Sequence, residues 1–374
     1  MIYLDYSATT PVNKEVLDSF NKTCLEYIGN SNSLHNLGVK SKNLEESATN
    51  QIANILNCQK EEVIYTSGSS ESNNLAIKGI ALKYQNRGKH IITTNLEHSS
   101  IYGPLGYLQQ IGFRVDFVKT NEFGLVDIEN LKELITKETI LVTIASVNSE
   151  SGIKQNIEQI ANLLINYPAT FFHVDATQSI GKVNIDFTNV DLISFSAHKF
   201  YGLKGIGCLI KKKNISLIPL IHGGKSTTNF RSGTPALPLI VSLSKALRLE
   251  TQNLDHEFEK IFDLNNYLKD KLKQYQDLVI NSNQFSIPHI LNISLINIKP
   301  ETMIHALEKY EIYISTQSAC AAGNTISKAI YEITKNELIA AHSIRISLSK
   351  LTTKLEIDTF LKYFDICYRK LNIK

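Results

Sequence analysis

Cysteine is scarce in this chain of 374 residues, and the cysteines that occur do not form pairs. They stand at positions 24, 58, 208, 320 and 367, and no two of them have the Cys-x-x-Cys spacing. Zinc sites typically use that spacing, and disulfide-stapled domains use an even set of cysteines in a much shorter chain. The sequence therefore predicts neither a metal site nor a disulfide framework.

A strong charge of one sign and a long hydrophobic run are missing as well. The formal net charge at pH 7 is only +3 and the lysines are scattered, so we expect no direct binding of nucleic acid. No apolar run approaches the length of a membrane span, and the first residues lack the pattern of a signal peptide. A hydrophobic content of 43% is typical of a globular protein. We therefore expect a cytoplasmic protein without membrane contact.

Short apolar segments alternate with helical stretches through the first part of the chain. Near-continuous apolar strands that alternate with helices are typical of a parallel sheet covered on both faces. We therefore predict an α/β fold whose large domain contains a mainly parallel, seven-stranded sheet covered by helices. The expected strands cover residues 63–66, 90–94, 114–118, 140–145, 170–174, 191–195 and 207–210.

The pattern changes after Pro238. Apolar residues recur every three or four positions from residue 254 to 272, which predicts one face of a long helix that leaves the large domain. Further strands, which predict a smaller α+β domain, are expected at residues 287–298, 312–316 and 343–347. We expect the large domain to span residues 15–250 and the small domain to combine residues 1–14 with 251–374.

One lysine stands between a predicted strand end and a glycine-rich turn. Lys199 closes the segment Ser196-Ala197-His198-Lys199, and glycines follow at positions 202, 205 and 207. A lysine in a partly desolvated pocket loses its proton more readily and becomes an amine nucleophile toward an aldehyde. The motif predicts a Schiff-base lysine for pyridoxal phosphate. A solvated lysine beside a turn is the alternative.

An aspartate closes the preceding predicted strand. Asp175 follows an apolar run, at the edge where open α/β sheets bind their ligands. Pyridoxal phosphate requires an acidic partner for its pyridinium nitrogen, because that proton makes the ring an electron sink. We predict that Asp175 has this role and that Gln178 donates to the phenolic oxygen of the ring. A helix N-cap is the alternative role for Asp175.

A strand, a glycine turn and a helix follow one another around Ser67-Gly68-Ser69-Ser70. A helix start binds phosphate through its free backbone N–H groups and its dipole. We therefore predict that Ser69 and Ser70 hold the cofactor phosphate. The segment is not a Walker loop, because no Gly-Lys-Ser/Thr follows the turn.

Three more residues carry weaker signals. His98 follows a predicted strand, where its imidazole could stack on the cofactor ring, although a structural histidine is the alternative. Thr234, in Arg231-Ser232-Gly233-Thr234, offers a hydroxyl to phosphate. Arg345 lies within a strand pattern and suits a bidentate grip on a carboxylate, although strand arginines also occur at solvated edges.

In their order along the chain, these motifs resemble those of a known family. From about residue 2 to residue 355 the chain is similar to the cysteine desulfurases of the iron–sulfur-cluster type, which are class V aminotransferase-like enzymes of fold type I. The motifs that carry this resemblance are Leu4-Asp5-Tyr6-Ser7-Ala8-Thr9-Thr10-Pro11, Thr66-Ser67-Gly68, Glu71-Ser72-Asn73-Asn74, Glu97-His98, His173-Val174-Asp175-Ala176-Thr177-Gln178-Ser179, Ser196-Ala197-His198-Lys199, Arg231-Ser232-Gly233-Thr234, Gln317-Ser318-Ala319-Cys320-Ala321-Ala322-Gly323 and His342-Ser343-Ile344-Arg345.

The resemblance implies an enzyme that converts L-cysteine to L-alanine with pyridoxal 5′-phosphate. In that family a loop cysteine takes the substrate sulfur as a persulfide, which assigns this role to Cys320. The resemblance also implies that Lys199 and His98 are catalytic and that Arg345 and Asn32 bind the substrate. The cofactor-binding residues that it implies are Ser69, Ser70, Ser149, Asp175, Gln178, Ser196, His198, Lys199 and Thr234.

The resemblance further implies a homodimer in which Thr234 reaches the partner's cofactor phosphate. The persulfide would pass to a scaffold or thiol protein, for the synthesis of iron–sulfur clusters, thio-cofactors or modified tRNA. The chain departs from the family pattern at Asn148-Ser149-Glu150, at Gly223-Gly224-Lys225-Ser226 and at Gly29-Asn30-Ser31. Two alternatives remain open. One is another pyridoxal enzyme, such as an aminotransferase or selenocysteine lyase, and the other is a weakly active relative retained as a sulfur-assembly partner.

Overall fold

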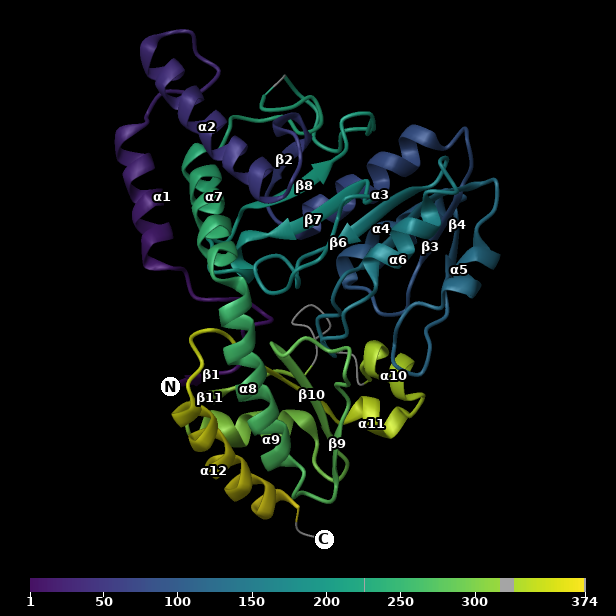
Figure 1. Ribbon diagram of the computed structural model, residues 1–374, viewed down its shortest axis with the longest axis vertical. Coiled ribbons are helices and arrows are strands. Elements are labelled where there is room, and N and C mark those ends of the chain that lie inside the picture. Colours follow the sequence, from purple (N-terminus) through teal and green to yellow (C-terminus); the bar gives the residue numbers. More distant parts are fainter. Residues whose placement is uncertain (225, 317–325, 373–374) are drawn as a thin grey trace.

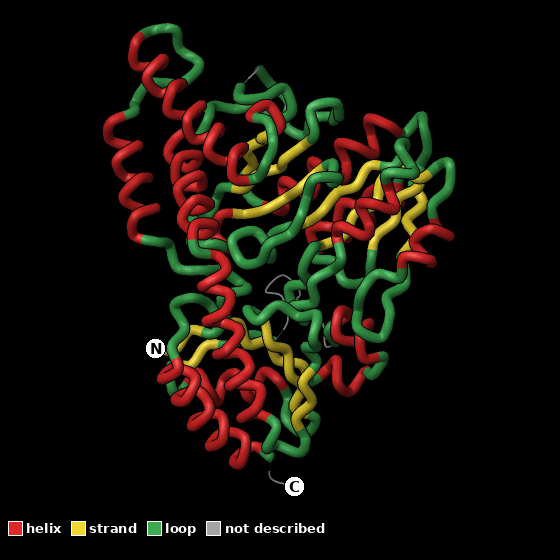
Figure 2. The backbone as a smooth tube through the Cα atoms, in the orientation of Figure 1, coloured by secondary structure: helices red, strands yellow, loops and turns green. Residues whose placement is uncertain are grey.

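The computed structural model describes residues 1–224, 226–316 and 326–372 (Figures 1 and 2). The described α-helices are α1 (Lys14–Glu26), α2 (Asn36–Ile55), α3 (Ser69–Tyr84), α4 (Ser99–Gln110), α5 (Ile128–Leu134), α6 (Ile157–Leu164), α7 (Leu237–Gln252), α8 (Leu254–Leu272), α9 (Pro300–Glu308), α10 (Lys328–Thr334), α11 (Glu337–Ala341) and α12 (Lys354–Leu371). The strands are β1 (Ile2–Tyr3), β2 (Val63–Thr66), β3 (His90–Thr93), β4 (Arg114–Phe117), β5 (Thr139–Ala145), β6 (Phe171–Asp175), β7 (Leu192–Ser196), β8 (Gly207–Lys211), β9 (Leu278–Ile280), β10 (Ile290–Leu295), β11 (Ile312–Tyr313) and β12 (Ser343–Ser347).

The largest sheet has seven strands in the order β2-β8-β7-β6-β5-β3-β4, which confirms the predicted fold class. All neighbouring strands from β7 to β4 run parallel, whereas β8 runs antiparallel to both β2 and β7. The reversal follows from the short connection between β7 and β8, because a parallel return needs a crossover of a dozen or more residues.

Helices cover both faces of this sheet, as its apolar pattern predicts. Adjacent strand residues point to opposite faces, so Ile91 packs with α3 and α4 whereas Ile92 packs with α2, α6 and α7. Both side chains are fully buried. A strand buried on both sides must be apolar at every position, which explains the near-continuous runs in the sequence.

The chain beyond α7 forms a second hydrophobic cluster, in the lower part of Figure 1. There β9, β10 and β12 form an antiparallel sheet, and α8, α9 and α12 pack against it. The first residues of the chain join this cluster, because β1 pairs with β11 and Leu4 is completely buried there. On this packing we propose residues 15–250 as one domain and residues 1–14 with 251–374 as the other.

The second region differs in detail from the sequence expectation. The strand expected over 287–298 is limited to β10, the strand expected over 312–316 is limited to β11, and β9 was not expected. Short amphipathic strands give little period-2 signal, so tertiary pairing decides their ends. None of the helices in the described ranges combines the length and apolar character that crossing a membrane requires.

Candidate active site

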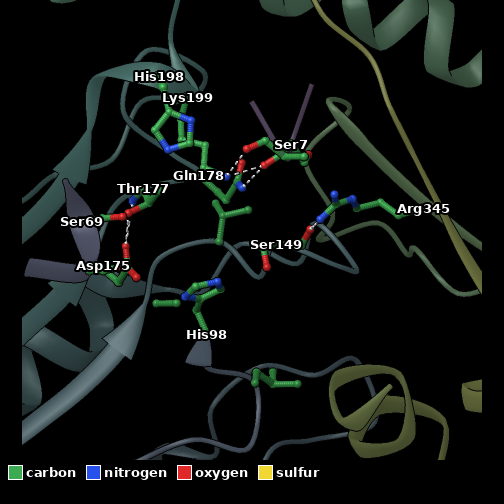
Figure 3. A pocket seen from close by; sticks show the side chains of 15 residues that line it. Ser7, Ser69, His98, Ser149, Asp175, Thr177, Gln178, His198, Lys199 and Arg345 are labelled. Atoms are coloured by element: carbon green, nitrogen blue, oxygen red, sulfur yellow. Dashed lines mark hydrogen bonds between the residues drawn. The ribbon is translucent and has the colours of Figure 1, made fainter. Parts of the chain in front are cut away.

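A pocket with about 800 Å³ of empty space, including its open mouth, lies beyond the carboxyl ends of β5, β6 and β7 (Figure 3). Parallel α/β sheets bind ligands at this edge. The side chains that line the pocket come from segments far apart in the sequence: Ser7, Ala8, Ser69, Ser70, Leu96, His98, Ala145, Val147, Ser149, Asp175, Thr177, Gln178, His198, Lys199 and Arg345.

Lys199 ends a short 3₁₀ turn, Ala197–Lys199, that directly follows β7. Its Nζ atom donates hydrogen bonds to the backbone carbonyl oxygens of Ser7, at 2.7 Å, and Ala8, at 2.8 Å. The first loop of the chain therefore holds the lysine at the pocket. A primary amine held in this way, and only partly exposed, is placed to react with a carbonyl compound that enters the pocket.

Asp175 is the last residue of β6 and is 6% exposed. Its Oδ2 atom accepts from Asn73 Nδ2 at 2.8 Å, and its Oδ1 atom accepts from the backbone N–H of Thr177 at 3.0 Å and from the Thr177 hydroxyl at 2.5 Å. Three donors thus fix the carboxylate at the pocket wall. A buried, oriented carboxylate suits a cationic ring nitrogen better than a free surface aspartate does.

The start of α3 faces the same pocket. No side chain caps this helix start, and Ser69 and Ser70 are its first two residues. The first N–H groups of a helix have no partner within the helix, so an uncapped start at a pocket suits a phosphate. The preceding Gly68 lies close to β8, since a Cβ atom on Gly207 would lie 2.7 Å from Gly68 Cα. Only glycine at position 207 permits this approach.

His98 is the N-cap of α4 and lines the pocket. Its Nδ1 atom accepts from the backbone N–H of Ser100 at 3.2 Å, which assigns the proton of the neutral ring to Nε2. Burial lowers the pKa of His98, and the nearby Lys199 lowers it further, while Asp175 opposes both effects. At neutral pH this residue therefore presents an uncharged ring, which suits stacking.

Glu97 is buried beside His98 and does not line the pocket itself. Its carboxyl group accepts from Thr94 Oγ1 at 2.7 Å and from the backbone N–H of Ala145 at 2.9 Å. Burial raises the pKa of Glu97 to about 8, and the charge of Asp175 adds to that effect. The side chain thus joins the end of β5 to the loop that carries His98.

Arg345 lies on β12, opposite the sheet edge, and is only 1% exposed. Its Nη2 atom donates to Asp5 Oδ1 at 2.8 Å, and its Nη1 atom donates to the backbone carbonyl of Ser149 at 2.9 Å. The Nε atom is buried without a hydrogen-bond partner. A buried guanidinium that lines a pocket suits an anionic ligand group, because its planar set of donors can bind a carboxylate or phosphate.

Gln178 follows β6 and brings an amide to the pocket. Its Nε2 atom donates to the backbone carbonyl of Ser7 at 3.0 Å, so Gln178 and Lys199 share this acceptor (Figure 3). His198 also lines the pocket, and its Nδ1 atom lies 3.1 Å from Thr9 Oγ1. The loop at residues 7–9 therefore contacts three side chains that the sequence assigned to the cofactor.

The structure gathers most of the predicted site residues but not all of them. Ser196 is buried at the end of β7 and does not line the pocket. Thr234 and Asn32 are exposed and lie outside it, and Cys320 lies outside the described residues. The functional roles of all these residues stay predictions.

Sequence reasoning gave no role to Ser7, Ala8, Asn73 or Thr177. Ser7 and Ala8 contribute backbone carbonyls to Lys199, and a carbonyl carries no residue-specific signal. Asn73 and Thr177 belong to the motifs given above, and both donate to the Asp175 carboxylate. A search of those motifs for donors to this carboxylate would have found them.

Comparison with known proteins gives consistent results. The aminotransferase class-V family matches residues 2–360. The cysteine desulfurase IscS of Buchnera aphidicola subsp. Acyrthosiphon pisum is 41% identical, with 96% of this chain and 91% of that protein covered. A solved structure described as a NifS-like protein superimposes with a TM-score of 0.94 at 33% identity, covering 99% of this chain and 100% of that one. SspA in complex with cysteine superimposes with a TM-score of 0.82 at 34% identity, covering 94% and 100%.

Proposed function

This chain belongs to the class V aminotransferase family, and from that premise we propose that it is a cysteine desulfurase that uses pyridoxal 5′-phosphate. One observation carries the proposal: Lys199, Asp175 and the uncapped start of α3 meet at a single pocket. The relative described above as a cysteine desulfurase is similar over nearly the whole chain, which favours this activity over the other pyridoxal enzymes of the fold.

The donor set of the pocket fits the cofactor. Ser69, Ser70 and the α3 N–H groups would hold its phosphate, Asp175 its ring nitrogen, and Gln178 its phenolic oxygen. Lys199 would hold its aldehyde carbon. When bound, the cofactor supplies an electron sink that stabilises negative charge at the substrate Cα. The buried carboxylate of Asp175 supports that chemistry because its three donors hold it in place.

The remaining residues bind and orient the substrate. Arg345 would take the α-carboxylate of L-cysteine, because its guanidinium lines the pocket and carries more N–H donors than the contacts with Asp5 and Ser149 use. Lys199 would carry the proton to and from Cα, because its amine lies at the pocket. His98 would exchange a proton with the substrate thiol through Nε2, since its Nδ1 atom is engaged at the start of α4.

The net reaction transfers one sulfur atom. The Cβ–S bond of L-cysteine breaks, an S–S bond forms on the Cys320 thiol to give a persulfide, and L-alanine leaves with a proton in place of sulfur. A scaffold or thiol protein then takes the sulfur. This part of the proposal rests on the sequence around Cys320.

The proposal includes a cytoplasmic homodimer. The end of α1 and the turn between α1 and α2 carry large apolar side chains in water. Leu25, Ile28 and Leu34 are exposed by 80%, 77% and 97%. Asn32 lies in the same turn, and an exposed apolar cluster of this kind is typical of an interaction surface. A partner that covers it would bring Asn32 and Thr234, both outside this chain's pocket, toward a pocket of the other subunit.

Two measurements test the proposal. The purified protein is expected to absorb as a pyridoxal enzyme, and borohydride reduction followed by peptide mapping should place the pyridoxyl group on Lys199. The variant Cys320→Ala is expected to keep that absorption and lose sulfide release from L-cysteine, while Cys24→Ala, which removes an exposed thiol on α1, keeps both. A label on Lys204, or full sulfide release by Cys320→Ala, would overturn the proposal.

A further inference from the structure

A second buried lysine lies behind the pocket, and nothing in the proposed reaction uses it. Lys182 is 7% exposed and follows Gly181 in the turn after β6. Its Nζ atom donates to Gln178 Oε1 at 2.5 Å. Lys182 and Lys199 both line a second, small cavity, which Ser7, a residue that lines the main pocket, also borders. Burying an amine is costly unless it is hydrogen-bonded, so the contact with Gln178 is what makes this position tolerable for a lysine.

The contacts of Gln178 show what the lysine does there. An amide side chain has one acceptor oxygen and one NH₂ group with two donors. Lys182 occupies the oxygen, and the carbonyl of Ser7 takes one proton of Nε2 at 3.0 Å. The flipped amide would set its oxygen against the Ser7 carbonyl and its NH₂ group against the lysine amine, so both contacts would be lost. Lys182 and Ser7 together therefore permit a single orientation.

That orientation leaves the second proton of Gln178 Nε2 for the pocket. A phenolate oxygen accepts hydrogen bonds, so it is stabilised by this donor and would be repelled by the amide oxygen.

We propose that Lys182 is a positioning residue, which fixes the Gln178 amide with its donor toward the phenolic oxygen of the cofactor. The inference deepens the proposed function and rests on it. It assigns Lys182 no contact with substrate or cofactor and no proton transfer, since it acts through Gln178 alone.

The test is the absorption spectrum of the bound cofactor and its apparent affinity, measured by titrating the apoprotein with pyridoxal phosphate. Lys182→Met is expected to shift the absorption maximum and to weaken cofactor binding about tenfold, the lower range for a hydrogen bond to a charged group. Lys211→Met is the matched control. Lys211 is a buried lysine on β8 that donates to the carbonyls of Lys212 and Ile215, away from the pocket, so its variant should keep the parental spectrum.

A mutant cycle separates positioning from a general structural effect. Gln178→Ala is expected to shift the spectrum by itself, and adding Lys182→Met to it should cause no further shift. Lys182→Arg keeps a donor and should restore the parental maximum. If Lys182→Met does not fold, Lys182→Leu, which also lacks a donor, replaces it with the same expected shift.

Three results would have distinct meanings. An unchanged spectrum and affinity in Lys182→Met overturns the inference. An equal shift in the presence and in the absence of Gln178 also overturns it, because Lys182 would then act by another route. A parent protein that takes up no pyridoxal phosphate overturns the proposed function instead.

Discussion

Single residues in this site work through neighbours that hold them. Asp175 is oriented by Asn73 and Thr177, and Lys199 is held by two backbone carbonyls. Glu97 is the clearest case. Its carboxyl group is buried with no cation beside it in the described part of the chain, and its hydrogen bonds join β5 to the loop that carries His98. The cost of burying the Glu97 carboxyl group should be visible in the free energy of unfolding.

Replacing Glu97 by glutamine is expected to change how stability depends on pH. Burial raises the Glu97 pKa from its ordinary value of 4.5 to about 8, so between these values the folded protein keeps a proton that the unfolded chain has released. The parent should therefore lose stability as the pH rises from 5 to 8, by at most about 1.4 kcal/mol per pH unit from this group. Glu97→Gln resembles the protonated acid and removes this contribution. Denaturant unfolding of the apoproteins at several pH values measures the difference, and a constant difference would contradict the assignment.

Ser149 is a second residue whose exchange should be informative. It lines the pocket where the family typically has asparagine, and its carbonyl accepts from Arg345. Ser149→Asn adds an amide donor on a longer arm, so we expect the variant to fold and to shift either the cofactor absorption or the rate of cysteine turnover. A lost or gained hydrogen bond to a charged oxygen corresponds to about 10- to 150-fold in rate or affinity. If spectrum, cofactor affinity and turnover all stay at parental values, Ser149 does not face the cofactor.

At the scale of elements, the sequence predicted the strands of the large sheet well and their directions less well. Buried strands such as β5 and β6 are apolar at every position, so their place is evident from the sequence. Nothing in the sequence of β8 states its direction, which the short connection after β7 imposes. The contact of Lys199 with Ser7 joins residues 192 positions apart through a backbone carbonyl, and no residue pattern reports such a contact.

The antiparallel β8 also shapes the phosphate site, which gives a prediction. Gly207→Ala would place a Cβ atom 2.6 Å from Phe195 O and 2.7 Å from Gly68 Cα, so the turn before α3 must move. We expect Gly207→Ala to lower the free energy of unfolding by about 1–3 kcal/mol and to bind pyridoxal phosphate more weakly than the parent does. Gly103→Ala is the control, because a Cβ atom there meets nothing within 4 Å. This variant should keep the parental cofactor affinity and lose no stability, since alanine favours a helix over glycine. Equal behaviour of the two variants would contradict the role given to Gly207.

At the scale of the whole molecule, two predicted residues remain away from the pocket of the single chain. Asn32 and Thr234 are exposed, and sequence motifs cannot tell whether a residue serves its own pocket or that of a second copy. Cys320 is assigned from its motif alone. The fold of a single chain does not account for the roles predicted for these three residues.

Leu34→Asp is expected to convert the proposed dimer to a monomer. Leu34 is 97% exposed in the turn that also presents Ile28, next to Leu25 at the end of α1, so a carboxylate there would have to be buried in the interface. Sedimentation velocity measures the change, and cofactor affinity should fall with it. Leu355→Asp is the matched control, since Leu355 is 75% exposed on α12, away from this turn. An unchanged sedimentation coefficient in Leu34→Asp would remove the α1–α2 turn from the interface.

The loop at residues 5–9 has a consequence for how the protein is made. Asp5 pairs with Arg345, which lies 340 positions later, and β1 can pair only after β11 has been synthesised. At about 5–20 residues per second, a ribosome needs roughly 20 to 70 s to synthesise the intervening chain. Ser7 can meet Lys199 once the chain has grown by 192 positions, whereas Asp5 cannot meet Arg345 until that residue has been made. The contact between Asp5 and Arg345 therefore forms later in synthesis than the contact between Ser7 and Lys199, and both hold side chains that line the same pocket.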